Sequence, residues 1–406
     1  MNTMNRTMSI KEAVLQALAD EISIPPGMAK EARDRFASIA RWMDRDGSTL
    51  AAADAHLHPQ GSYLLGTVIR PVGDRDEYDV DMVCTLRALP ITEKSQADVK
   101  ADVGYEVRGY AEAHGMREPV EGRRCWRIDY AKSARFHCDI LPSVPRSPGP
   151  GVLAVEPGAL SSHLLAAGRT VIGITDREHP DYDRRSPAWN MGNPKGYELW
   201  FKNRQRQVLE ERLRTRRTRD GVRATVEELP LQDVSTPLQD AIKLLKRHRD
   251  VIFNGDPHKP ISIIIATLAA HAYGGQETIS DTLHAVLPRM DSFIENRGGA
   301  PWVENPACPD ENFADRWVAT SKKAANFHAW LLQARRDFGD YILMSDALSL
   351  PDGLRTRMTE TTVGKVLPRL GLTTPALAAP ALPRLVADEE ARYVLIEGRP
   401  TKPWLP

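Results

Sequence analysis

Three aspartates are the residues of this sequence whose types and spacing are best suited to catalysis. Asp79 and Asp81 stand one residue apart in EYDVDMVCTL, where apolar and polar residues alternate as in a strand. Both side chains are therefore expected on one face, about 7 Å apart at the Cα atoms. Asp139 lies in a second short apolar segment, FHCDILPSV, where an unpaired charge is costly to bury. Carboxylates are the ligands that magnesium prefers, and two such ions about 4 Å apart catalyse nucleotidyl transfer, so the pattern predicts a two-metal site.

A glycine–serine pair precedes these carboxylates in HPQGSYLLGTVI. Gly61 lets the backbone approach a phosphate closely, and Ser62 stands where a helix can begin, so its hydroxyl and nearby N–H groups can face an anion. Each feature alone has an ordinary interpretation, because a Gly-Ser pair is usually a helix cap and an Asp-Val-Asp alternation usually belongs to a surface strand. The order of the three features along the chain favours a catalytic site.

The histidines near these motifs have simpler predicted roles. His56 and His58 flank the Gly-Ser stretch, where they could contact a nucleotide, but the simpler expectation is that they are loop or surface residues. His137 is expected to face away from Asp139 and to have a structural role. The segment from Gly66 to Tyr78 is either a flap over a bound nucleotide or a surface loop, and the sequence leaves both open.

Length and composition limit the classes to which this protein can belong. The chain has 406 residues, of which 42% are hydrophobic, enough for two domains or one bilobal body. Acidic and basic residues balance to a formal net charge of zero, so no overall field attracts nucleic acid. The four cysteines form no CxxC pair and have no histidine at ligand spacing, which argues against a disulfide framework and a zinc site. No segment approaches the roughly 20 apolar residues of a membrane span, and we expect a soluble, cytoplasmic protein.

Hydrophobic periodicity predicts an α+β fold with a mixed sheet flanked by helices. The N-terminal part, residues 1–235, is expected to hold a helical brace (10–22 and 29–46), strands at 77–86, 125–132 and 136–144, and a helix at 96–115. Residues 236–406 are expected to be a helical lobe with a Pro/Ala-rich tail, with helical pattern over 238–253, 261–274, 279–297 and 312–339. Between them, the basic run 202–220 is interpreted as a solvated helix, because glutamates interrupt it.

Together, HPQGSYLLGTVIRP, DEYDVDMVC and FHCDILPSVP resemble the polymerase-β-like nucleotidyltransferases. Within that superfamily the chain resembles the bacterial cGAS/DncV-like nucleotidyltransferases (CD-NTases), which make cyclic oligonucleotide signals in anti-phage defence. This narrower resemblance rests on the N-terminal helices and on AIKLLKRHRD, KPISIIIATLAAHAYGG and ENPACPDENFADRW. It implies a bilobal fold and an enzyme that joins NTPs, releases pyrophosphate and closes a cyclic dinucleotide or trinucleotide.

The resemblance also implies roles for single residues. Asp79, Asp81 and Asp139 would hold two Mg²⁺ ions, or Mn²⁺ in their place. The residues implied in nucleotide binding are Gln60, Gly61, Ser62, Tyr63, Lys243, Lys246, Ser262 and Asn305. For Lys243 and Lys246, which share a helix face, a solvated basic surface is the alternative. Related enzymes often have Asp-Pro where this chain has Asn305–Pro306, which leaves open the base that a second pocket reads.

The implied partners are ATP and GTP, or another NTP, as substrates of a monomer, and a separate effector protein as the target of the product. Because the chain lacks a His/Cys cluster, zinc-dependent DNA sensing is not expected. Two other functions compete with this hypothesis. One is a nucleotidyltransferase that modifies RNA or protein, against which the neutral charge argues, because an RNA track is usually basic. The other is a catalytically silent nucleotide sensor.

Overall fold

The chain folds into two compact units, each described here by itself. The computed structural model describes residues 9–73, 78–130, 136–146, 170–220, 235–343, 350–372, 384–387 and 393–396. The sheet unit comprises Ile24–Asn203 and Glu304–Phe313, and the helical unit comprises Met1–Ser23, Arg204–Val303 and Ala314–Pro406. This division groups the first helix with the helical unit, whereas the sequence analysis placed it within residues 1–235.

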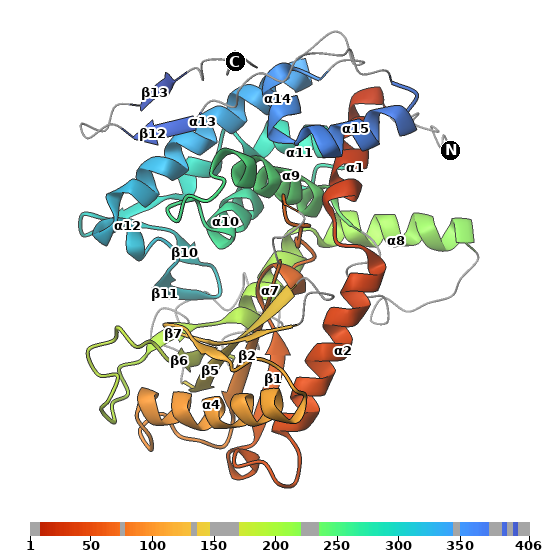
Figure 1. Ribbon diagram of the computed structural model, residues 1–406. Helices are drawn as coiled ribbons and strands as arrows, with labels where there is room; N and C mark the ends of the chain where they lie inside the picture. The colour runs from red at the N-terminus through yellow and green to blue at the C-terminus, as the bar shows by residue number, and fades with distance from the viewer. Residues whose placement is uncertain are drawn as a thin grey trace, which may run out of the picture. The chain divides into compact units, whose positions relative to one another are not determined.

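A mixed sheet forms the centre of the sheet unit (Figure 1). Its strands are β1 (Ala55–Pro59), β2 (Tyr78–Leu86), β3 (Val120–Glu121), β4 (Trp126–Asp129), β5 (Phe136–Pro145), β6 (Ile172–Ile174) and β7 (Asn190–Gly192). The strand order is β1-β2-β5-β4-β3, and β6 pairs with both β5 and β7. β2 and β5 are parallel, whereas the other pairs are antiparallel. The two strands that carry the predicted catalytic aspartates are therefore direct neighbours, and the predicted α+β class is confirmed.

Two helices, α2 (Pro26–Met43) and α4 (Gln96–Ala113), cover one face of this sheet. α4 begins with a capping box, in which Ser95 and Asp98 satisfy each other's backbone N–H groups. Its apolar residues recur at helical spacing and are buried against one side of the strands. The residues packed there include Val99, Val103, Val107, Val80, Met82, Cys138 and Ile140. Since strand residues alternate between faces, the residues between these apolar ones lie on the opposite face.

Shorter elements complete the sheet unit. They are η1 (Ala51–Ala53), α3 (Gly61–Leu64), α7 (Pro194–Arg204, of which the last residue belongs to the helical unit), β10 (Glu304–Asn305) and β11 (Cys308–Asn312). β10 and β11 form an antiparallel hairpin, and β11 packs near β7. The hairpin thus joins this unit although it lies far along the chain.

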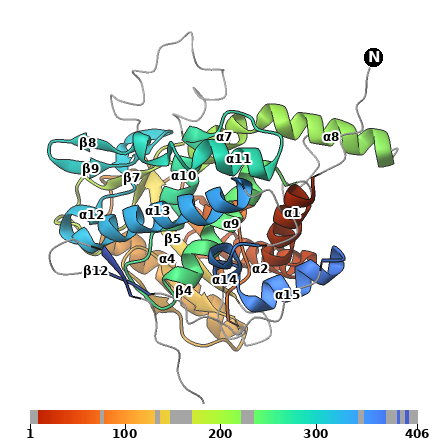
Figure 2. The ribbon, with the colours of Figure 1, turned by 90° about the horizontal axis from the view of Figure 1, so that it is seen from above.

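The helical unit is built around α9 (Pro237–Ile252). Its other elements are α1 (Ile10–Ile22), α8 (Arg206–Asp220), α10 (Ser262–Ala272), α11 (Ile279–Val286), η2 (Met290–Phe293), β8 (Glu295–Arg297), β9 (Ala300–Trp302), α12 (Arg316–Ala319), α13 (Ser321–Leu343), α14 (Asp352–Arg357), α15 (Glu360–Arg369), β12 (Arg384–Ala387) and β13 (Tyr393–Ile396). α9 contacts α1, α10, α11, α13 and α14, and Figure 2 shows α13 running beside it. A capping box formed by Thr236 and Gln239, with a proline at the first turn, starts α9.

Polar contacts attach α1 to this unit. The carboxylate of Glu12 accepts hydrogen bonds from the backbone N–H groups of Ile279, at 2.7 Å, and Ser280, at 2.9 Å. These groups open α11, where a negative charge is favourable. Lys11 donates to the carbonyl of Ile342 at 2.8 Å. These bonds explain why α1 groups with helices far from it in sequence.

Most predicted elements are found, with three main differences. The helix predicted over 312–339 is divided, because Asn312 ends β11, α12 covers Arg316–Ala319 and α13 begins only at Ser321. The helical pattern predicted over 279–297 is wrong beyond Val286, because Pro288 cannot continue a helix and β8 follows from Glu295. The stretch at 55–59, expected as a loop, is strand β1, which pairs with β2. The Pro/Ala-rich tail apart from β12 and β13, and parts of the 66–78 and 145–235 segments, lie outside the described residues. Among the helices that are described, none is long and apolar enough to cross a membrane.

Candidate active site

The sheet face opposite α2 and α4 carries two rows of polar residues across three strands. The register of β2, β5 and β4 places Asp79, His137 and Asp129 in one row, and Asp81, Asp139 and Arg127 in the next. We call these six residues the acidic face. Laterally paired strand residues lie about 5 Å apart, so the three predicted catalytic aspartates are brought together on neighbouring strands.

His137 belongs to this face, so the expectation that it faces away from Asp139 was wrong. Residues two apart in a strand point to the same side, and the imidazole Nε2 of His137 contacts the carboxylate of Asp79. Burial alone would lower the pKa of His137, but the hydrogen bond and the charge of Asp79 outweigh it and raise the pKa above its ordinary value. Asp79 itself is well exposed, with 59% of its side chain accessible.

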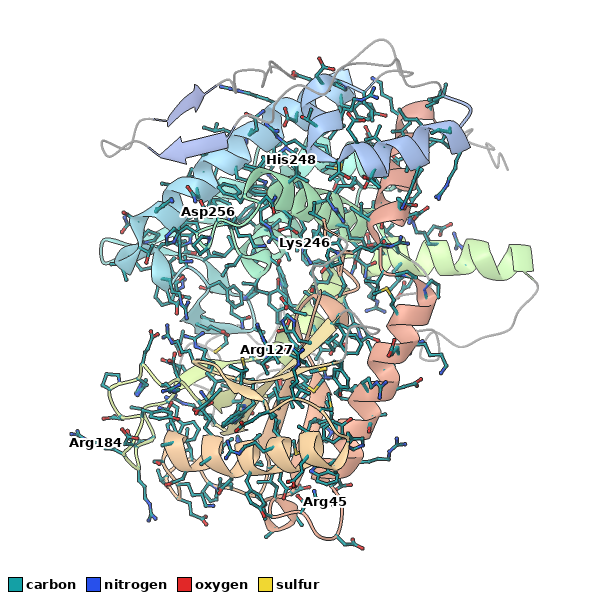
Figure 3. All side chains as sticks on the ribbon, viewed as in Figure 1. Arg45, Arg127, Arg184, Lys246, His248 and Asp256 are labelled. Atoms are coloured by element: carbon teal, nitrogen blue, oxygen red, sulfur yellow. The ribbon has the colours of Figure 1, made fainter. Side chains whose placement is uncertain are left out.

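Asp139 is paired with Arg127 on the adjacent strand. Arg127 is labelled in Figure 3. Arg127 donates from Nε to Oδ1 at 2.9 Å and from Nη2 to Oδ2 at 3.0 Å, a two-point pairing. The hydrogen bonds to Asp139 raise the pKa of Arg127 further above its ordinary value. The sequence analysis missed this residue. The signal was present in CWRIDYAK, where alternation puts Arg127 and Asp129 opposite the core residues Trp126 and Ile128.

The Gly-Ser motif meets the carboxylates at Asp81. Gly61 has a φ of +64°, and a Cβ atom built on it would lie 2.2 Å from Oδ2 of Asp81. The backbone N–H of Gln60 donates to the carbonyl of Asp81 at 2.9 Å. Only glycine combines this backbone conformation with so close an approach. The end of β1 and the start of α3 are thereby held directly against the acidic face.

The residues around Gly61 have distinct surroundings. The hydroxyl of Tyr63 donates to the carbonyl of Ala29 in α2 at 3.0 Å, so it is directed toward the core helices. Ser62 accepts a backbone hydrogen bond from Thr67 at 2.9 Å, which closes the turn after α3. His58 lies on β1 rather than in a loop, and its burial, chiefly, lowers its pKa to about 4.

Lys243, Lys246 and Ser262 belong to the helical unit. Lys243 and Lys246 are only 8% and 4% exposed, so the alternative of a solvated basic surface does not hold for them. The ammonium of Lys243 lies 3.1 Å from Oδ1 of Asp240. The hydroxyl of Ser262, at the start of α10, accepts from Nη1 of Arg249 at 2.8 Å.

Asn305 holds the β10–β11 hairpin together. The residue is only 2% exposed. Its side-chain amide donates a hydrogen bond to Glu311 at 2.7 Å and accepts one from the N–H of Ala307 at 2.9 Å. Both halves of its amide thus have partners within the sheet unit. The predicted contact of Asn305 with a base stays a prediction.

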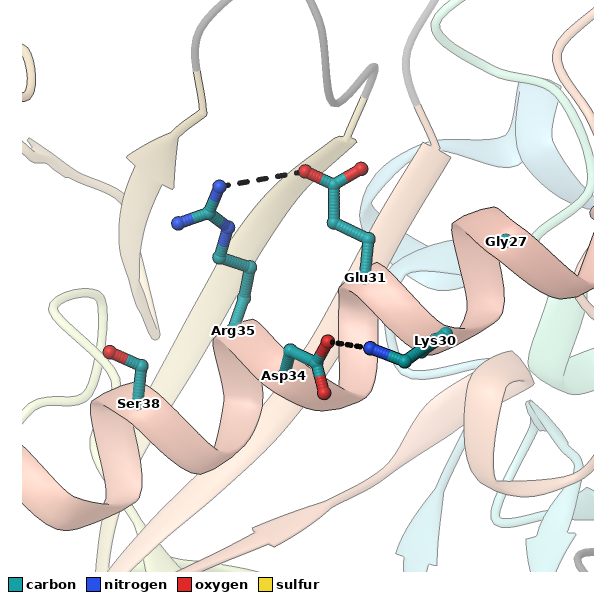
Figure 4. Close-up of a pocket in the computed structure, with 6 residues that line it drawn as sticks. All are labelled: Gly27, Lys30, Glu31, Asp34, Arg35 and Ser38. Carbon is teal, nitrogen blue, oxygen red and sulfur yellow. Dashed lines mark hydrogen bonds and ion pairs between the residues drawn. The ribbon is translucent and has the colours of Figure 1, made fainter.

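A shallow hollow along α2 is separate from the acidic face (Figure 4). It is lined by Gly27, Lys30, Glu31, Asp34, Arg35 and Ser38. Its charged residues pair along the helix, Lys30 with Asp34 at 2.7 Å and Arg35 with Glu31 at 3.6 Å. None of the predicted site residues lines it.

Comparisons with known proteins agree with this geometry. The family model "Cyclic GMP-AMP synthase DncV-like, nucleotidyltransferase domain" matches residues 55–142, which contain Gly61 and the three aspartates. A c-di-GMP synthase of Roseivirga ehrenbergii is 27% identical over 333 residues, covering 81% of this chain and 79% of that protein. The cyclic dinucleotide synthase CdnG of Bradyrhizobium diazoefficiens is 26% identical over 316 residues, covering 75% and 70%. Residues 55–142 thus match a DncV-like nucleotidyltransferase domain, and most of the chain is similar to bacterial cyclic dinucleotide synthases.

A solved structure supports the CD-NTase fold. The structure of the Bradyrhizobium diazoefficiens CD-NTase CdnG in complex with GTP matches 89% of this chain and 100% of that one, with a TM-score of 0.65 and 22% sequence identity. The likeness therefore extends through both units of the chain. The polymerase-β-like fold predicted from the sequence motifs is confirmed.

Proposed function

We propose that this protein synthesises a cyclic dinucleotide from NTPs, with GTP among its substrates, and releases pyrophosphate. The observation that carries the proposal is the acidic face, on which Asp79, Asp81 and Asp139 lie in register beside Gly61. Both curated relatives are cyclic dinucleotide synthases, and the structural relative was solved with GTP. An anti-phage signalling role, through a separate effector that binds the product, is part of the proposal.

The acidic face fits divalent ions by the chemistry of its donors. It offers three carboxylates on adjacent strands, and the carboxylate of Asp81 occupies the place that a side chain at Gly61 would take. In the described residues no three aspartate, glutamate, cysteine or histidine side chains are grouped closely enough to hold an ion. Arg127 engages Asp139, and His137 contacts Asp79. We propose two Mg²⁺ ions, replaceable by Mn²⁺, held by the three aspartates. When bound, such ions activate a ribose hydroxyl and neutralise the triphosphate.

The chain's own residues orient the reactants in this scheme. Gln60, Gly61 and Ser62 hold the triphosphate, and Gly61 keeps this turn against Asp81 because a Cβ atom there would meet the Asp81 carboxylate. In each transfer a ribose hydroxyl forms a bond to the α-phosphorus of the other nucleotide, and the bond from that phosphorus to pyrophosphate breaks. We assign the proton of the hydroxyl to Asp139. A second transfer, from the free hydroxyl of the linear intermediate, closes the ring and releases the second pyrophosphate.

The test uses the purified full chain with ATP, GTP, CTP and UTP, singly and mixed, and Mg²⁺ or Mn²⁺. Pyrophosphate release is followed, and products are identified by mass and nuclease sensitivity. We expect a cyclic product containing guanine from the wild type and none from Asp79→Asn/Asp81→Asn. The matched control is Asp54→Asn, which removes an exposed carboxylate of the same unit that pairs with Arg87 at 2.7 Å. This control is expected to retain full activity.

Other outcomes point elsewhere. A product that forms only after RNA or a protein acceptor is added would replace the proposal with a macromolecule-modifying nucleotidyltransferase. Nucleotide binding without pyrophosphate release, unchanged in Asp79→Asn/Asp81→Asn, would indicate a silent sensor. A cyclic trinucleotide would correct the ring size and leave the chemistry intact.

A further inference from the structure

The acidic face has more negative than positive groups. Its carboxylates are Asp79, Asp81, Asp129 and Asp139, and its basic groups are Arg127 and His137. Arg127 is the one member of the six that is positively charged at every working pH. Asp81 and Asp139 are lateral neighbours in parallel strands, so their charges repel each other unless a cation lies close. Arg127 occupies the next position in that same row.

Arg127 engages both oxygens of Asp139, at 2.9 and 3.0 Å. A divalent ion bound to the same carboxylate would lie within a few ångströms of the guanidinium, where like charges repel by on the order of several kcal/mol before screening. The two side chains differ in exposure, since 44% of Arg127 and 16% of Asp139 is accessible. The long, more exposed side chain of Arg127 can therefore move into solvent, whereas the short side chain of Asp139 keeps its carboxylate close to its strand.

We infer that Arg127 is an internal counter-ion, which occupies Asp139 in the ion-free enzyme and gives way when a divalent ion binds. Arg127 thereby sets the affinity of the site for that ion, acting through Asp139 as a positioning residue. The inference rests on the proposed function, because it assumes that Asp139 is an ion ligand. It assigns this arginine a role that the carboxylate motif alone does not reveal.

The experiment measures Mn²⁺ binding to the nucleotide-free full chain by the loss of the electron paramagnetic resonance signal of free Mn²⁺. Arg127→Gln is expected to bind Mn²⁺ on the order of tenfold more tightly than the wild type, because the competing charge is gone. Arg127→Lys keeps the charge but loses the two-point geometry, so its affinity is expected between the two. Arg87→Gln, which breaks the exposed pair with Asp54, is expected to leave the affinity unchanged.

Thermal melting gives a second measurement that does not depend on activity. In chelator, Arg127→Gln is expected to melt below the wild type, because Asp139 loses the guanidinium that pairs with it beside Asp81. Adding Mn²⁺ should raise the melting temperature more in Arg127→Gln than in the wild type. In Arg127→Gln/Asp139→Asn, the gain in Mn²⁺ affinity should disappear.

Two results would overturn the inference in distinguishable ways. If Arg127→Gln and Arg127→Lys bind Mn²⁺ as the wild type does, or more weakly, while Asp139→Asn still weakens binding, Arg127 is not a competitor and the proposed function stands. If Asp139→Asn and Asp79→Asn/Asp81→Asn bind Mn²⁺ as tightly as the wild type does, the three aspartates do not form the ion site. That second result would overturn both this inference and the metal-dependent part of the proposed function.

Discussion

Replacing Gly61 by alanine tests whether the Gly-Ser turn and the carboxylate strand form one site. The new Cβ atom would lie 2.2 Å from Oδ2, 3.1 Å from Cγ and 3.3 Å from Cβ of Asp81. Atoms that are not bonded rarely come closer than about 3 Å, so the carboxylate or the turn must move by about 1 Å. A displacement on that scale in a catalytic group lowers turnover on the order of 100-fold.

The same substitution also strains the backbone, and this effect must be separated from the first. Gly61 has a φ of +64°, a left-handed conformation that costs alanine about 1–2 kcal/mol. Gly115 supplies the matched control, because its φ is +61° and a Cβ built on it meets no heavy atom within 4 Å. Gly61→Ala and Gly115→Ala should therefore lose similar backbone stability, whereas only Gly61→Ala presses on Asp81.

The assay pairs pyrophosphate release at saturating NTP with urea unfolding. We expect Gly115→Ala to keep the wild-type turnover and Gly61→Ala to lose about two orders of magnitude, at comparable free energies of unfolding. If Gly61→Ala turns over within about threefold of Gly115→Ala, Asp81 does not lie against Gly61 in the working enzyme. The reasoning that joins the two motifs into one site would then be refuted.

Three further predictions concern stability. Burial alone would raise the pKa of Asp176, but hydrogen bonds from two arginines outweigh it and lower the pKa from 3.8 to about 2. Asp176→Asn should therefore lower the free energy of unfolding by about 2 kcal/mol near pH 7 in urea melts, a difference that shrinks as pH falls from 4 toward 2; a pH-independent difference would contradict this. Glu12→Gln should lower the free energy of unfolding by about 1 kcal/mol in the same assay, because the N–H groups at the start of α11 lose a charged acceptor. An unchanged urea melt would show that these hydrogen bonds do not stabilise the unit. Gly104→Ala should lower the free energy of unfolding by about 1–3 kcal/mol, because its Cβ would lie 2.3 Å from the ring of Trp126. A wild-type free energy of unfolding would show that the ring can shift to make room.

Local patterns in the sequence were enough to predict most of the longer elements and the strand that carries Asp79 and Asp81. Alternation in EYDVDMVCTL put Asp79 and Asp81 on one side because strand residues have a period of two, and β2 has that form over Tyr78–Leu86. Helical spacing gave α1 over Ile10–Ile22, since its buried leucines and valine recur on one face. The helix predicted over 279–297 was wrong beyond Val286, although Pro288, which ends helices, is visible in the sequence.

The pairing and register of the strands could not be predicted from the sequence, and they decide which residues meet on the acidic face. β5 pairs with β2 in parallel and with β4 in antiparallel register. This pairing depends on how whole helices and strands pack and not on residues that are adjacent in the sequence. That register sets Arg127 opposite Asp139 and His137 beside Asp79. Burial of Lys243 and Lys246 is non-local in the same way, because their own helix has polar residues there and only the elements packed around it exclude water. The sequence determined the donors of the site, and the tertiary structure determined the partners of each donor, because lateral contacts in a sheet join segments that are distant along the chain.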